Sequence, residues 1–318
     1  MPKPVLLVTR RLPVEIEALA AQDYDARLTA SDTAIADLLA RAEGADAILC
    51  CPGDRMDTAT ITALPDRVKV IGTFSVGHDH IDIAAARARG IKVCNTPDVL
   101  SVATAECAML LILSAARRAG EGERLVRSGE WAGWAPTQLL GTQVSGRRLG
   151  IFGMGRIGRE IARMARGFDM EIHYRDMARL PPDLECGAMF HDSDDSFLPM
   201  CEFLSLNAPG GDGTRHWLDH ARIARLPGGA VVVNAARGTL VDDAALIAAL
   251  RSGHIAAAGL DVYDSEPNVH SDYLTLQNVV LLPHLGSATT ETRDAMGRVV
   301  LDGIAAILAG RSPANLVS

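Results

Sequence analysis

A glycine-rich turn is the first feature of this sequence that could do chemistry. Gly153, Gly155 and Gly158 form a G-x-G-x-x-G pattern that directly follows the apolar run Leu149–Phe152 and opens a helical pattern at Ile157–Gly167. In this context the first glycine allows a tight turn, the second lets the backbone approach a pyrophosphate, and the third permits close packing of helix on strand. The helix N-terminus can then donate N–H groups to phosphates. The pattern predicts a dinucleotide site, with an ordinary strand-to-helix turn as the alternative.

Polar and turn-forming residues follow several other apolar runs of the chain. Ligands of a doubly wound parallel sheet lie beyond the carboxyl ends of its strands, so we expect these residues around one crevice. An arginine, two acids and a histidine there suit an anionic substrate and the transfer of a proton. Each residue alone could be a cap or a surface charge, but their repeated position after strands indicates a site. They are Asp176, Asn207–Pro209, Asn234–Gly238, Asp261 and His284.

The elements that must position these residues follow from hydropathy. Short apolar or β-branched runs alternate with helical patterns, such as those at 32–41, 157–167 and 242–252. The runs are continuously apolar, as in sheets with helices on both faces. The alternation predicts an α/β fold with doubly wound parallel sheets. The expected strands are Val5–Thr9, Ala47–Cys51, Val70–Phe74, Leu149–Phe152, Glu171–Arg175, Phe203–Leu206, Ala230–Asn234, Ala256–Leu260 and Asn278–Leu282.

One stretch of the chain departs from this alternation. Val99–Ala119 is long and apolar nearly all round, so we expect a helix that is buried between layers. Gly120–Gln143 is charged, lacks periodicity and contains Trp131 and Trp134. Such a segment is unusual in a compact domain unless it packs on something else. The regular alternation restarts after it, so a domain boundary is expected near residue 100.

The composition bounds the class of protein. The chain has 318 residues, of which 48% are hydrophobic and 22% charged, as in ordinary globular proteins of this size, which commonly divide into two domains. The net charge of −8 and the 4% of aromatic residues argue against a nucleic-acid partner. No stretch approaches the roughly 20 apolar residues of a membrane span, and no signal peptide is recognisable. The six cysteines form no C-x-x-C pattern and are interpreted as reduced thiols, so we expect a cytoplasmic protein.

Several motifs together resemble those of the D-2-hydroxyacid dehydrogenase family, from the first expected strand to the last expected helix. The resemblance implies a Rossmann cofactor domain, a flavodoxin-like substrate domain, and an NAD-dependent oxidoreductase that acts on a small 2-oxo or 2-hydroxy acid. The motifs that carry it are GTFSVGHDHID (Gly72–Asp82), VATAE (Val102–Glu106), LGIFGMGRIG (Leu149–Gly158), VNAARG (Val233–Gly238), GLDVYDSEP (Gly259–Pro267) and PHLGSAT (Pro283–Thr289).

The resemblance also implies how the chain is divided. The helical pattern at 291–309 has no strand after it and could return to the first domain. A dimerisation arm is expected near 114–145, so that the protein is a homodimer in which Trp134 lies near the partner's active site; core filling is the alternative for this tryptophan. The implied bounds are 1–99 with 288–318 for the substrate domain and 100–287 for the NAD-binding domain, with hinges near 100 and 288.

Three side chains and one backbone turn receive catalytic roles from the resemblance. His284 would be the proton donor and acceptor, Glu266 would hydrogen-bond it, and Arg237 would bind the substrate carboxylate and polarise the C2 carbonyl. The N–H groups of Val76 and Gly77 would hold the carboxylate from the substrate domain. These roles agree with general chemistry. Histidine exchanges protons near neutral pH, an adjacent carboxylate favours its charged form, and the planar arginine fork matches a carboxylate.

A longer set of residues is implied around NAD. Arg156 and Ile157 would lie at the pyrophosphate, Asp176 at the adenosine ribose and Asp261 at the carboxamide. Two closing lobes would keep water from the reduced nicotinamide. The full set is Thr104, Gly153, Gly155, Arg156, Ile157, Gly158, Asp176, Ala208, Pro209, Ala235, Ala236, Arg237, Asp261, His284, Gly286 and Ser287.

Asp176 also predicts which form of the cofactor is preferred. A carboxylate there accepts hydrogen bonds from both ribose hydroxyls and repels a 2′-phosphate. The next residue is Met177 rather than an arginine, although Arg175 and Arg179 are near enough in sequence to reach a phosphate. Strand alternation favours an Arg175 side chain that points away from Asp176. We therefore predict that NADH is preferred over NADPH.

Within the family, the chain most resembles members that reduce hydroxypyruvate. The resemblance predicts reduction of hydroxypyruvate to D-glycerate, and of glyoxylate to glycolate. One alternative is another D-2-hydroxyacid substrate, such as 3-phosphoglycerate. Another is an NADH-sensing role like that of the C-terminal binding protein corepressors, which have similar residues at the three catalytic positions; the acidic charge and the tryptophan-bearing arm favour the enzyme. The segments that carry this finer resemblance are Ser114–Pro136, Phe190–Leu198 and Ser205–Pro209.

Two other groups of residues are weighed as sites. His78, Asp79 and His80 with Asp82 could be a metal cluster, but a turn followed by a helix cap at Asp82 explains them, so no metal is predicted. Cys51 could line the substrate pocket, although a buried structural thiol is the simpler interpretation. The remaining histidines have no ligand spacing and are expected at the surface: His173, His191, His216, His220, His254 and His270.

Overall fold

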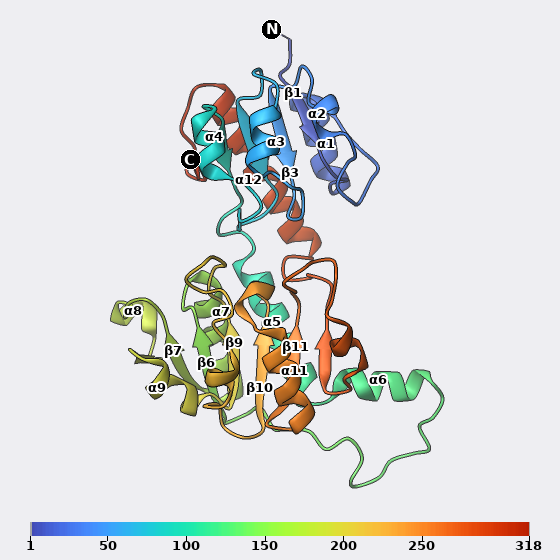
Figure 1. Cartoon of the computed structure of the whole chain (residues 1–318), viewed down its shortest axis with the longest axis vertical. Helices are drawn as coiled ribbons and strands as arrows, with labels where there is room; N and C mark the ends of the chain where they lie inside the picture. The colour runs from blue at the N-terminus through green and yellow to red at the C-terminus, as the bar shows by residue number, and fades with distance from the viewer. Residues whose placement is uncertain (1, 318) are drawn as a thin grey trace. The chain divides into compact units, whose positions relative to one another are not determined.

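The computed structural model describes residues 2–317 and divides into two compact units, each with its own parallel sheet (Figure 1). Unit 1 comprises Met1–Leu100 and Ser287–Ser318, and unit 2 comprises Ser101–Gly286. The chain therefore passes from one unit to the other after Leu100 and again after Gly286. Among the residues described, no helix is long and apolar enough to cross a membrane.

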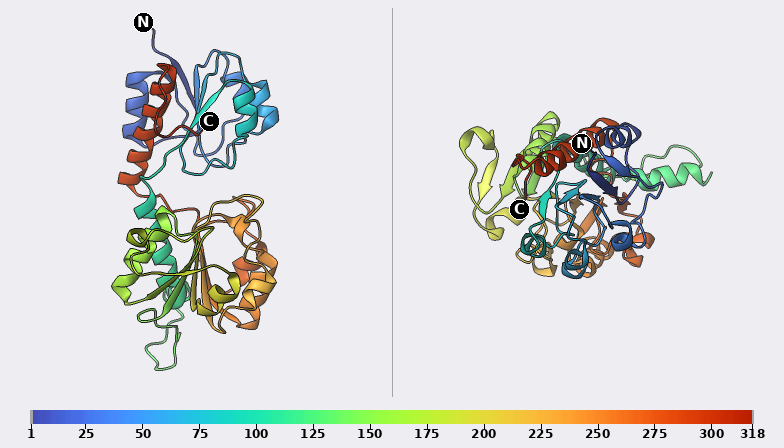
Figure 2. Two further views of the ribbon diagram at one scale, coloured as in Figure 1. Left: turned by 90° about the vertical axis from the view of Figure 1, so that its left-hand side faces the viewer. Right: turned by 90° about the horizontal axis from the view of Figure 1, so that it is seen from above.

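Unit 1 is built on a five-stranded parallel sheet in the order β2-β1-β3-β4-β5. Figure 2 shows helices α1 (Val14–Asp23) and α12 (Thr290–Leu308) on one face of this sheet and α3 (Thr58–Ala63) and α4 (Ile83–Ala88) on the other. Because both faces are covered, the inner strands are almost wholly buried and mostly apolar, with Thr73 at the end of β4 as a buried polar residue. The order is that of flavodoxin-like folds. The strands are β1 (Val5–Val8), β2 (Asp25–Arg27), β3 (Ala47–Cys50), β4 (Val70–Thr73) and β5 (Lys92–Cys94).

Three helices of unit 1, α3, α4 and α12, begin at side-chain caps. Asp82 caps α4 by accepting the N–H of Ala85, which confirms the predicted cap. Helix α12 approaches β4 at Gly72, where a Cβ atom would lie 2.7 Å from Ile304, so a side chain at this position would push the helix away. The helices are α1 (Val14–Asp23), α2 (Leu38–Arg41), α3 (Thr58–Ala63), α4 (Ile83–Ala88) and α12 (Thr290–Leu308).

Unit 2 is built on a seven-stranded parallel sheet in the order β12-β11-β10-β9-β6-β7-β8. Helices α5 and α7 cover one face and α11 covers the other (Figure 2). The strand order changes direction between β6 and β9, as in Rossmann folds. The strands are β6 (Arg148–Phe152), β7 (Glu171–Arg175), β8 (Met189–His191), β9 (Phe203–Leu206), β10 (Ala230–Asn234), β11 (Ile255–Leu260) and β12 (Val279–Leu281).

The long apolar helix of unit 2 is shorter than its sequence pattern. Helix α5 ends before Arg118, whose left-handed φ of 54° separates it from α6. After α6, residues 128–147 contain neither helix nor strand, and Trp134 is 82% exposed. The helices of the unit are α5 (Ser101–Ala116), α6 (Ala119–Arg127), α7 (Arg156–Ala165), α8 (Pro182–Glu185), α9 (Asp194–Phe197), α10 (His220–Ile223) and α11 (Asp243–Ser252).

The two parallel sheets confirm the predicted fold class. Every expected strand is present, to within a residue or two at its ends. The sequence pattern missed β2, β5 and β8, which have three residues each and lie at sheet edges, where a strand need not be a continuous apolar run. The predicted helix at 32–41 was largely wrong: only Leu38–Arg41 is helical, after Asp37 with a φ of 55°.

Candidate active site

The glycine-rich turn lies where the strand order of unit 2 changes direction. Gly153 has a φ of 94°, and a Cβ atom there would lie 2.6 Å from the N atom of Ala208, so the turn after β6 touches the loop after β9. A Cβ atom at Gly158 would overlap the carbonyl oxygen of Gly153, so α7 packs directly against the turn. At Gly155 a Cβ atom would meet no atom within 4 Å. The space beside this glycine, at the start of α7, fits the backbone approach that a pyrophosphate needs.

Asp176, directly after β7, is fixed against this turn. Its Oδ2 accepts the N–H of Met154 at 2.7 Å, and its Oδ1 accepts the N–H of Met177 at 2.7 Å. The first of these bonds joins the end of β7 to the glycine-rich turn. The carboxylate is therefore held at the carboxyl end of β7, where it can accept hydrogen bonds from the hydroxyls of a ribose.

The two arginines near Asp176 have partners of their own. The Arg175 guanidinium donates to the carbonyl of Asp176 and lies 3.7 Å from Asp194. Arg179 forms two hydrogen bonds with Glu185, at 2.8 and 3.1 Å. The pKa of the Glu185 carboxyl is lowered by these bonds to Arg179, and by a further one from Tyr174. Neither arginine points its charge at the Asp176 carboxylate.

His284, just after β12, is paired with Glu266. The Nδ1 atom of His284 lies 2.8 Å from Oε2 of Glu266, and both side chains are partly exposed. Burial raises the pKa of the Glu266 carboxyl, but the hydrogen bond and charge of His284, together with the N–H of Tyr263 and the charge of Arg237, bring it below its ordinary value. The carboxylate is thus charged and can only accept, so the histidine donates from Nδ1. Nε2 is then the ring nitrogen that can exchange a proton with a substrate.

Arg237, after β10, is held beside this pair by its own loop. The buried Asn234 donates from Nδ2 to the carbonyl of Arg237 at 2.8 Å and accepts the N–H of Ala236 at 3.0 Å. A Cβ atom at Gly238 would overlap the backbone of Tyr263, so the arginine loop packs against the turn that leads to Glu266. The charge of Arg237 lowers the pKa of Glu266. The structure therefore brings the three predicted catalytic side chains together in unit 2.

Asp261, after β11, fastens the backbone around His284. It is fully buried, its carbonyl accepts the N–H of His284 at 2.9 Å, and its carboxylate accepts those of Leu285 at 2.6 Å and Gly286 at 2.8 Å. Burial raises the pKa of the Asp261 carboxyl, while these two N–H groups favour its charged form. His284 is held at a φ of 58°, a left-handed conformation that a residue other than glycine adopts at a cost. Asp261 thereby keeps the imidazole in a fixed place.

Unit 1 contains the predicted backbone turn. Three successive carbonyls of the turn are fastened inside the unit: that of Ser75 by the N–H of Thr96 at 2.9 Å, that of Val76 by Nδ2 of Asn95 at 2.8 Å, and that of Gly77 by the Ser75 hydroxyl at 2.6 Å. Within residues 2–317, the N–H groups of Val76 and Gly77 have no acceptor. Adjacent N–H groups of this kind can bind an anion.

Cys51 lines a cavity of about 390 Å³ within unit 1. Phe74 and the arginines Arg11 and Arg293 contribute to the same wall. Burial and the nearby charge of Asp54 raise the pKa of the Cys51 thiol to about 12. The thiol is therefore protonated at neutral pH, as expected of a structural cysteine. Cys51 thus has features of both interpretations, because it also lines a cavity.

The other residues expected around the cofactor lie where their elements place them. Thr104 is buried on α5, its side chain 3.4 Å from where a Cβ atom of Gly286 would be. Ser287 opens the return of the chain to unit 1, and its carbonyl accepts Nε of Arg293 at 3.1 Å. The rest are in the first turn of α7 and in the loops after β9 and β10: Arg156, Ile157, Pro209, Ala235 and Ala236.

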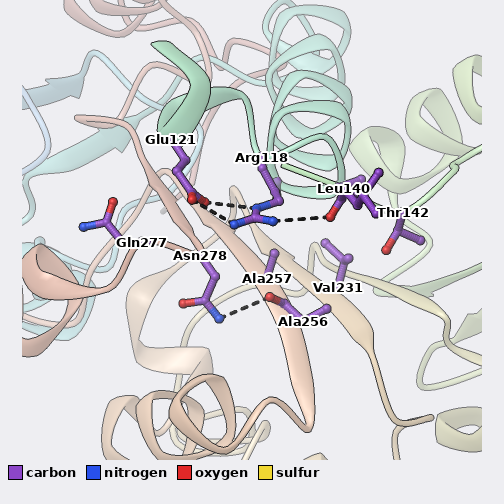
Figure 3. A pocket seen from close by; sticks show the side chains of 12 residues that line it. Arg118, Glu121, Leu140, Thr142, Val231, Ala256, Ala257, Gln277 and Asn278 are labelled. Atoms are coloured by element: carbon purple, nitrogen blue, oxygen red, sulfur yellow. Dashed lines mark hydrogen bonds and ion pairs between the residues drawn. The ribbon is translucent and has the colours of Figure 1, made fainter. Parts of the chain in front are cut away.

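A second cavity, of about 300 Å³, lies in unit 2, at the edge of the sheet away from the glycine-rich turn and His284 (Figure 3). Arg118 and Glu121 form two hydrogen bonds beside it, at 3.0 and 2.8 Å, and Asn278 donates to the carbonyl of Ala256. Its wall includes Val231 of β10 and Ala256 and Ala257 of β11, which lie near the starts of these strands, whereas ligands of such a sheet bind beyond the ends of the strands. Leu140 also lines it, so the segment that carries Trp134 is anchored there.

The structure corrects one expectation and adds residues that the sequence did not reveal. His173 is not at the surface: it is 1% exposed on β7, and its Nδ1 lies 2.9 Å from Nε2 of His191. Asn234 and Tyr263 shape the active-site loops; Asn234 was expected at the strand ends without a role of its own, and Tyr263 was not predicted. Asn234 stood in a strand-end motif, and its burial beside Arg237 was the missing information. Tyr263 donates to the carbonyl of Leu282 at 2.8 Å, a contact between distant segments.

Similarity to known proteins points to the same chemistry as the geometry of this site. Residues 109–286 match the family model of the D-isomer specific 2-hydroxyacid dehydrogenases, NAD binding domain. The chain is similar to a glycerate dehydrogenase of Hyphomicrobium methylovorum, with 44% identity over 314 residues and 98% of each chain covered. It is also similar to a glyoxylate reductase of Thermococcus onnurineus, with 39% identity over 99% of this chain and 96% of that protein.

A solved structure extends the similarity to the fold. The NADPH-dependent glyoxylate/hydroxypyruvate reductase of Sinorhizobium meliloti, in complex with NADP and malonate, aligns with a TM-score of 0.87. The identity is 30%, and the alignment covers 99% of this chain and 97% of that one. The two parallel sheets, the glycine-rich turn and the histidine–glutamate pair define an oxidoreductase that uses NAD(H). The chain belongs to the D-isomer specific 2-hydroxyacid dehydrogenase family, as the resemblance of its motifs had implied.

Proposed function

We propose that this enzyme reduces hydroxypyruvate to D-glycerate with NADH, and glyoxylate to glycolate. The observation that carries the proposal is the 2.8 Å contact between His284 and Glu266 beside Arg237, at the strand ends that also form the dinucleotide turn. These groups can protonate an oxyanion and bind a carboxylate. The similarity of the chain to a glycerate dehydrogenase and to a glyoxylate reductase supports the choice of substrates.

His284 delivers the proton in this proposal. Because Nδ1–H donates to Glu266, the protonated ring presents its second hydrogen on Nε2 to the oxygen on C2, where negative charge develops. In the oxidation direction the neutral ring takes the hydroxyl proton back. Proton transfer of this kind commonly contributes about 10²–10⁴ in rate.

Arg237 and the Val76–Gly77 turn bind the substrate. Arg237 offers a planar fork to the carboxylate and polarises the carbonyl oxygen at C2. The Val76 and Gly77 N–H groups bind the same carboxylate, which every 2-oxo acid carries. The fastened carbonyls of this turn support the role, because they leave the N–H groups for an external acceptor.

NADH, when bound, supplies the hydride that C2 accepts. The Gly153–Gly158 turn would hold the pyrophosphate of the cofactor, and Asp176 would bind its adenosine ribose. Thr104, Pro209 and the remaining loop residues would contact the rest of the cofactor. We include in this proposal a preference for NADH over NADPH. It is supported by the position of Asp176 and by the engagement of Arg175 and Arg179 with other partners.

The proposal also assigns roles to the units and to the exposed arm. Unit 1 would be the substrate domain, unit 2 the cofactor domain, and residues 114–145 the contact of a homodimer. Large apolar side chains on this segment are exposed in the single chain: Val126 by 61%, Trp134 by 82% and Leu140 by 67%. A second copy that covers them would place Trp134 near the partner's active site.

A panel of 2-oxo acids tests the proposal. Purified protein is assayed with NADH and with NADPH against hydroxypyruvate, glyoxylate, pyruvate, 2-oxobutyrate and 3-phosphohydroxypyruvate. The proposal expects the highest kcat/KM for hydroxypyruvate with NADH. A higher kcat/KM for 3-phosphohydroxypyruvate would mean that this acid, and not hydroxypyruvate, is the substrate. Tight NADH binding without turnover of any acid would instead favour a binding protein that senses the cofactor.

A further inference from the structure

A chain of hydrogen bonds in unit 1 links a histidine to the turn that presents its N–H groups. Nε2 of His80 lies 3.1 Å from Oγ1 of Thr73, which lies 2.7 Å from Oγ of Ser75, and that hydroxyl donates to the carbonyl of Gly77 at 2.6 Å. Thr73 is fully buried and Ser75 is 8% exposed. We call these four residues the His80 relay. It begins in the His78–His80 segment, which the sequence analysis interpreted as a turn before the helix cap at Asp82 rather than as a metal cluster.

The direction of every hydrogen bond in the relay follows from counting hydrogens. A carbonyl oxygen only accepts, so the single hydroxyl hydrogen of Ser75 points to Gly77. Thr73 must then donate its own hydroxyl hydrogen to Ser75. With that hydrogen used, the contact between Thr73 and His80 is a hydrogen bond only if the histidine donates from Nε2. A bare Nε2 would leave two lone pairs facing each other at 3.1 Å.

The buried thiol next to the relay is compatible with this direction. The Sγ atom of Cys50 lies 3.9 Å from the same Nε2 of His80. Burial raises the pKa of the Cys50 thiol well above its ordinary value, so the sulfur is a weak, uncharged acceptor. The hydrogen on Nε2 therefore has the Thr73 hydroxyl as its main acceptor, with the sulfur beside it.

We infer that His80, Thr73 and Ser75 are positioning residues, which orient the Val76–Gly77 N–H groups toward the carboxylate of the substrate. The inference rests on the proposed function, in which that turn binds the carboxylate. The hydrogen bond from the Ser75 hydroxyl to the Gly77 carbonyl closes a ring that contains the two peptide groups carrying the Val76 and Gly77 N–H, and Thr73 and His80 keep that hydroxyl in place. Loss of the relay therefore weakens the binding of every 2-oxo acid, whatever the substituent on its keto carbon.

Two variants of the central hydroxyl separate hydrogen bonding from packing. Thr73→Val removes the hydroxyl and keeps the shape of the side chain, whereas Thr73→Ser keeps the hydroxyl. For Thr73→Val we expect KM for hydroxypyruvate and for glyoxylate to rise by the same factor, about 3- to 10-fold, which is the effect of one buried hydrogen bond. The value of kcat and the Kd for NADH change less than 2-fold, by about the error of such measurements. Thr73→Ser restores KM to near that of the parent enzyme.

A spectroscopic measurement tests the relay without any assay of activity. In the full-length protein labelled with ¹⁵N at histidine, the neutral ring of His80 should carry its hydrogen on Nε2, and Thr73→Val should weaken that preference. A hydrogen on Nδ1 alone in the parent protein overturns the inference. His80→Gln, whose amide nitrogen can also donate, should preserve KM better than His80→Leu.

The outcomes distinguish this inference from the proposed function. If the parent protein reduces no 2-oxo acid, the proposed function fails, and the ¹⁵N measurement still decides the direction of the relay. If the parent enzyme is active and Thr73→Val leaves KM unchanged, the positioning role is wrong. If Thr73→Val does not fold, Ser75→Ala with Ser75→Thr as its control takes its place, with the same expected rise in KM.

Discussion

The Nδ1 atom of His284 lies 2.8 Å from Oε2 of Glu266, while Oε1 of the same carboxylate accepts the N–H of Tyr263 at 3.0 Å. Both oxygens of Glu266 are thus engaged, and the carboxylate cannot turn without breaking a bond. On the other side, Asp261 fixes the backbone of His284. The imidazole is therefore oriented by two acids that act differently, one through its ring and one through its main chain.

The pair with Glu266 predicts a change in the pH dependence of reduction. The pKa of the Glu266 carboxyl is lowered in part by the hydrogen bond and charge of His284, so the carboxylate and the protonated ring stabilise each other. Glu266→Gln removes the negative charge, and the proton is then held less firmly. Reduction, which needs that proton, should fail at a lower pH than in the parent enzyme. The pH profile of kcat/KM measures this; an unshifted profile means that the pair does not act in catalysis, and Glu43→Gln at an exposed position is the control.

Asp176 predicts the choice between NADH and NADPH. Its carboxylate, held by the N–H groups of Met154 and Met177, would repel a 2′-phosphate. Asp176→Ser should raise KM for NADH and lower it for NADPH, narrowing the gap between the two cofactors. The exposed substitution Asp212→Ser should change neither. A parent enzyme with equal or higher kcat/KM for NADPH would show that the arginines, and not Asp176, govern this pocket.

Alanine at two glycines of the dinucleotide turn should affect two different properties, folding stability at Gly158 and NADH binding at Gly155. Gly158→Ala places a Cβ atom onto the carbonyl of Gly153, so it should lower the free energy of unfolding by about 1–3 kcal/mol. At Gly155 a Cβ atom meets open space, so Gly155→Ala should fold normally and weaken NADH binding, because the methyl group occupies the place of the pyrophosphate. Thermal unfolding and NADH titration of both variants check this. Unchanged NADH affinity in Gly155→Ala would show that the pyrophosphate does not bind beside Gly155.

Trp134 predicts an active site that depends on the dimer. The parent protein should sediment as a dimer at working concentration, and Trp134→Ala should lose activity. Mixing Trp134→Ala with His284→Ala chains, and letting them exchange, should restore part of it, because one site of each mixed dimer is then complete. An active monomer, or no recovery in mixed dimers, would refute a role for Trp134 across the interface.

Sequence patterns predicted those parts of the site that local chemistry specifies. The glycine turn could be recognised because its residue types are required by backbone geometry at Gly153 and Gly158. His284, Glu266 and Arg237 were assigned by resemblance, and periodicity alone would have left them as polar residues after strands. What no local pattern could show was how distant loops hold one another. Asp261 and His284 are joined by one main-chain hydrogen bond, which exists only once β11 and β12 are paired.

The misses have physical causes of the same kind. His173 looked like a surface residue because histidine on a strand has no intrinsic preference for burial, and its partner His191 lies on a three-residue edge strand that the pattern missed. Helix α5 stopped earlier than its apolar pattern because the chain turns at Arg118 to begin α6. In both cases the neighbours that decide the outcome are supplied by tertiary structure.

The role of His284 as the proton donor is tested by the steady-state reduction of hydroxypyruvate by the parent enzyme and by His284→Ala. We expect NADH-dependent turnover by the parent enzyme and a loss of about 10²–10⁴ in kcat for the variant, because the imidazole supplies the proton. We expect nearly unchanged NADH affinity by titration, because the pyrophosphate is held by the Gly153–Gly158 turn and not by the imidazole. Near-normal turnover by His284→Ala, with intact folding, would contradict the account.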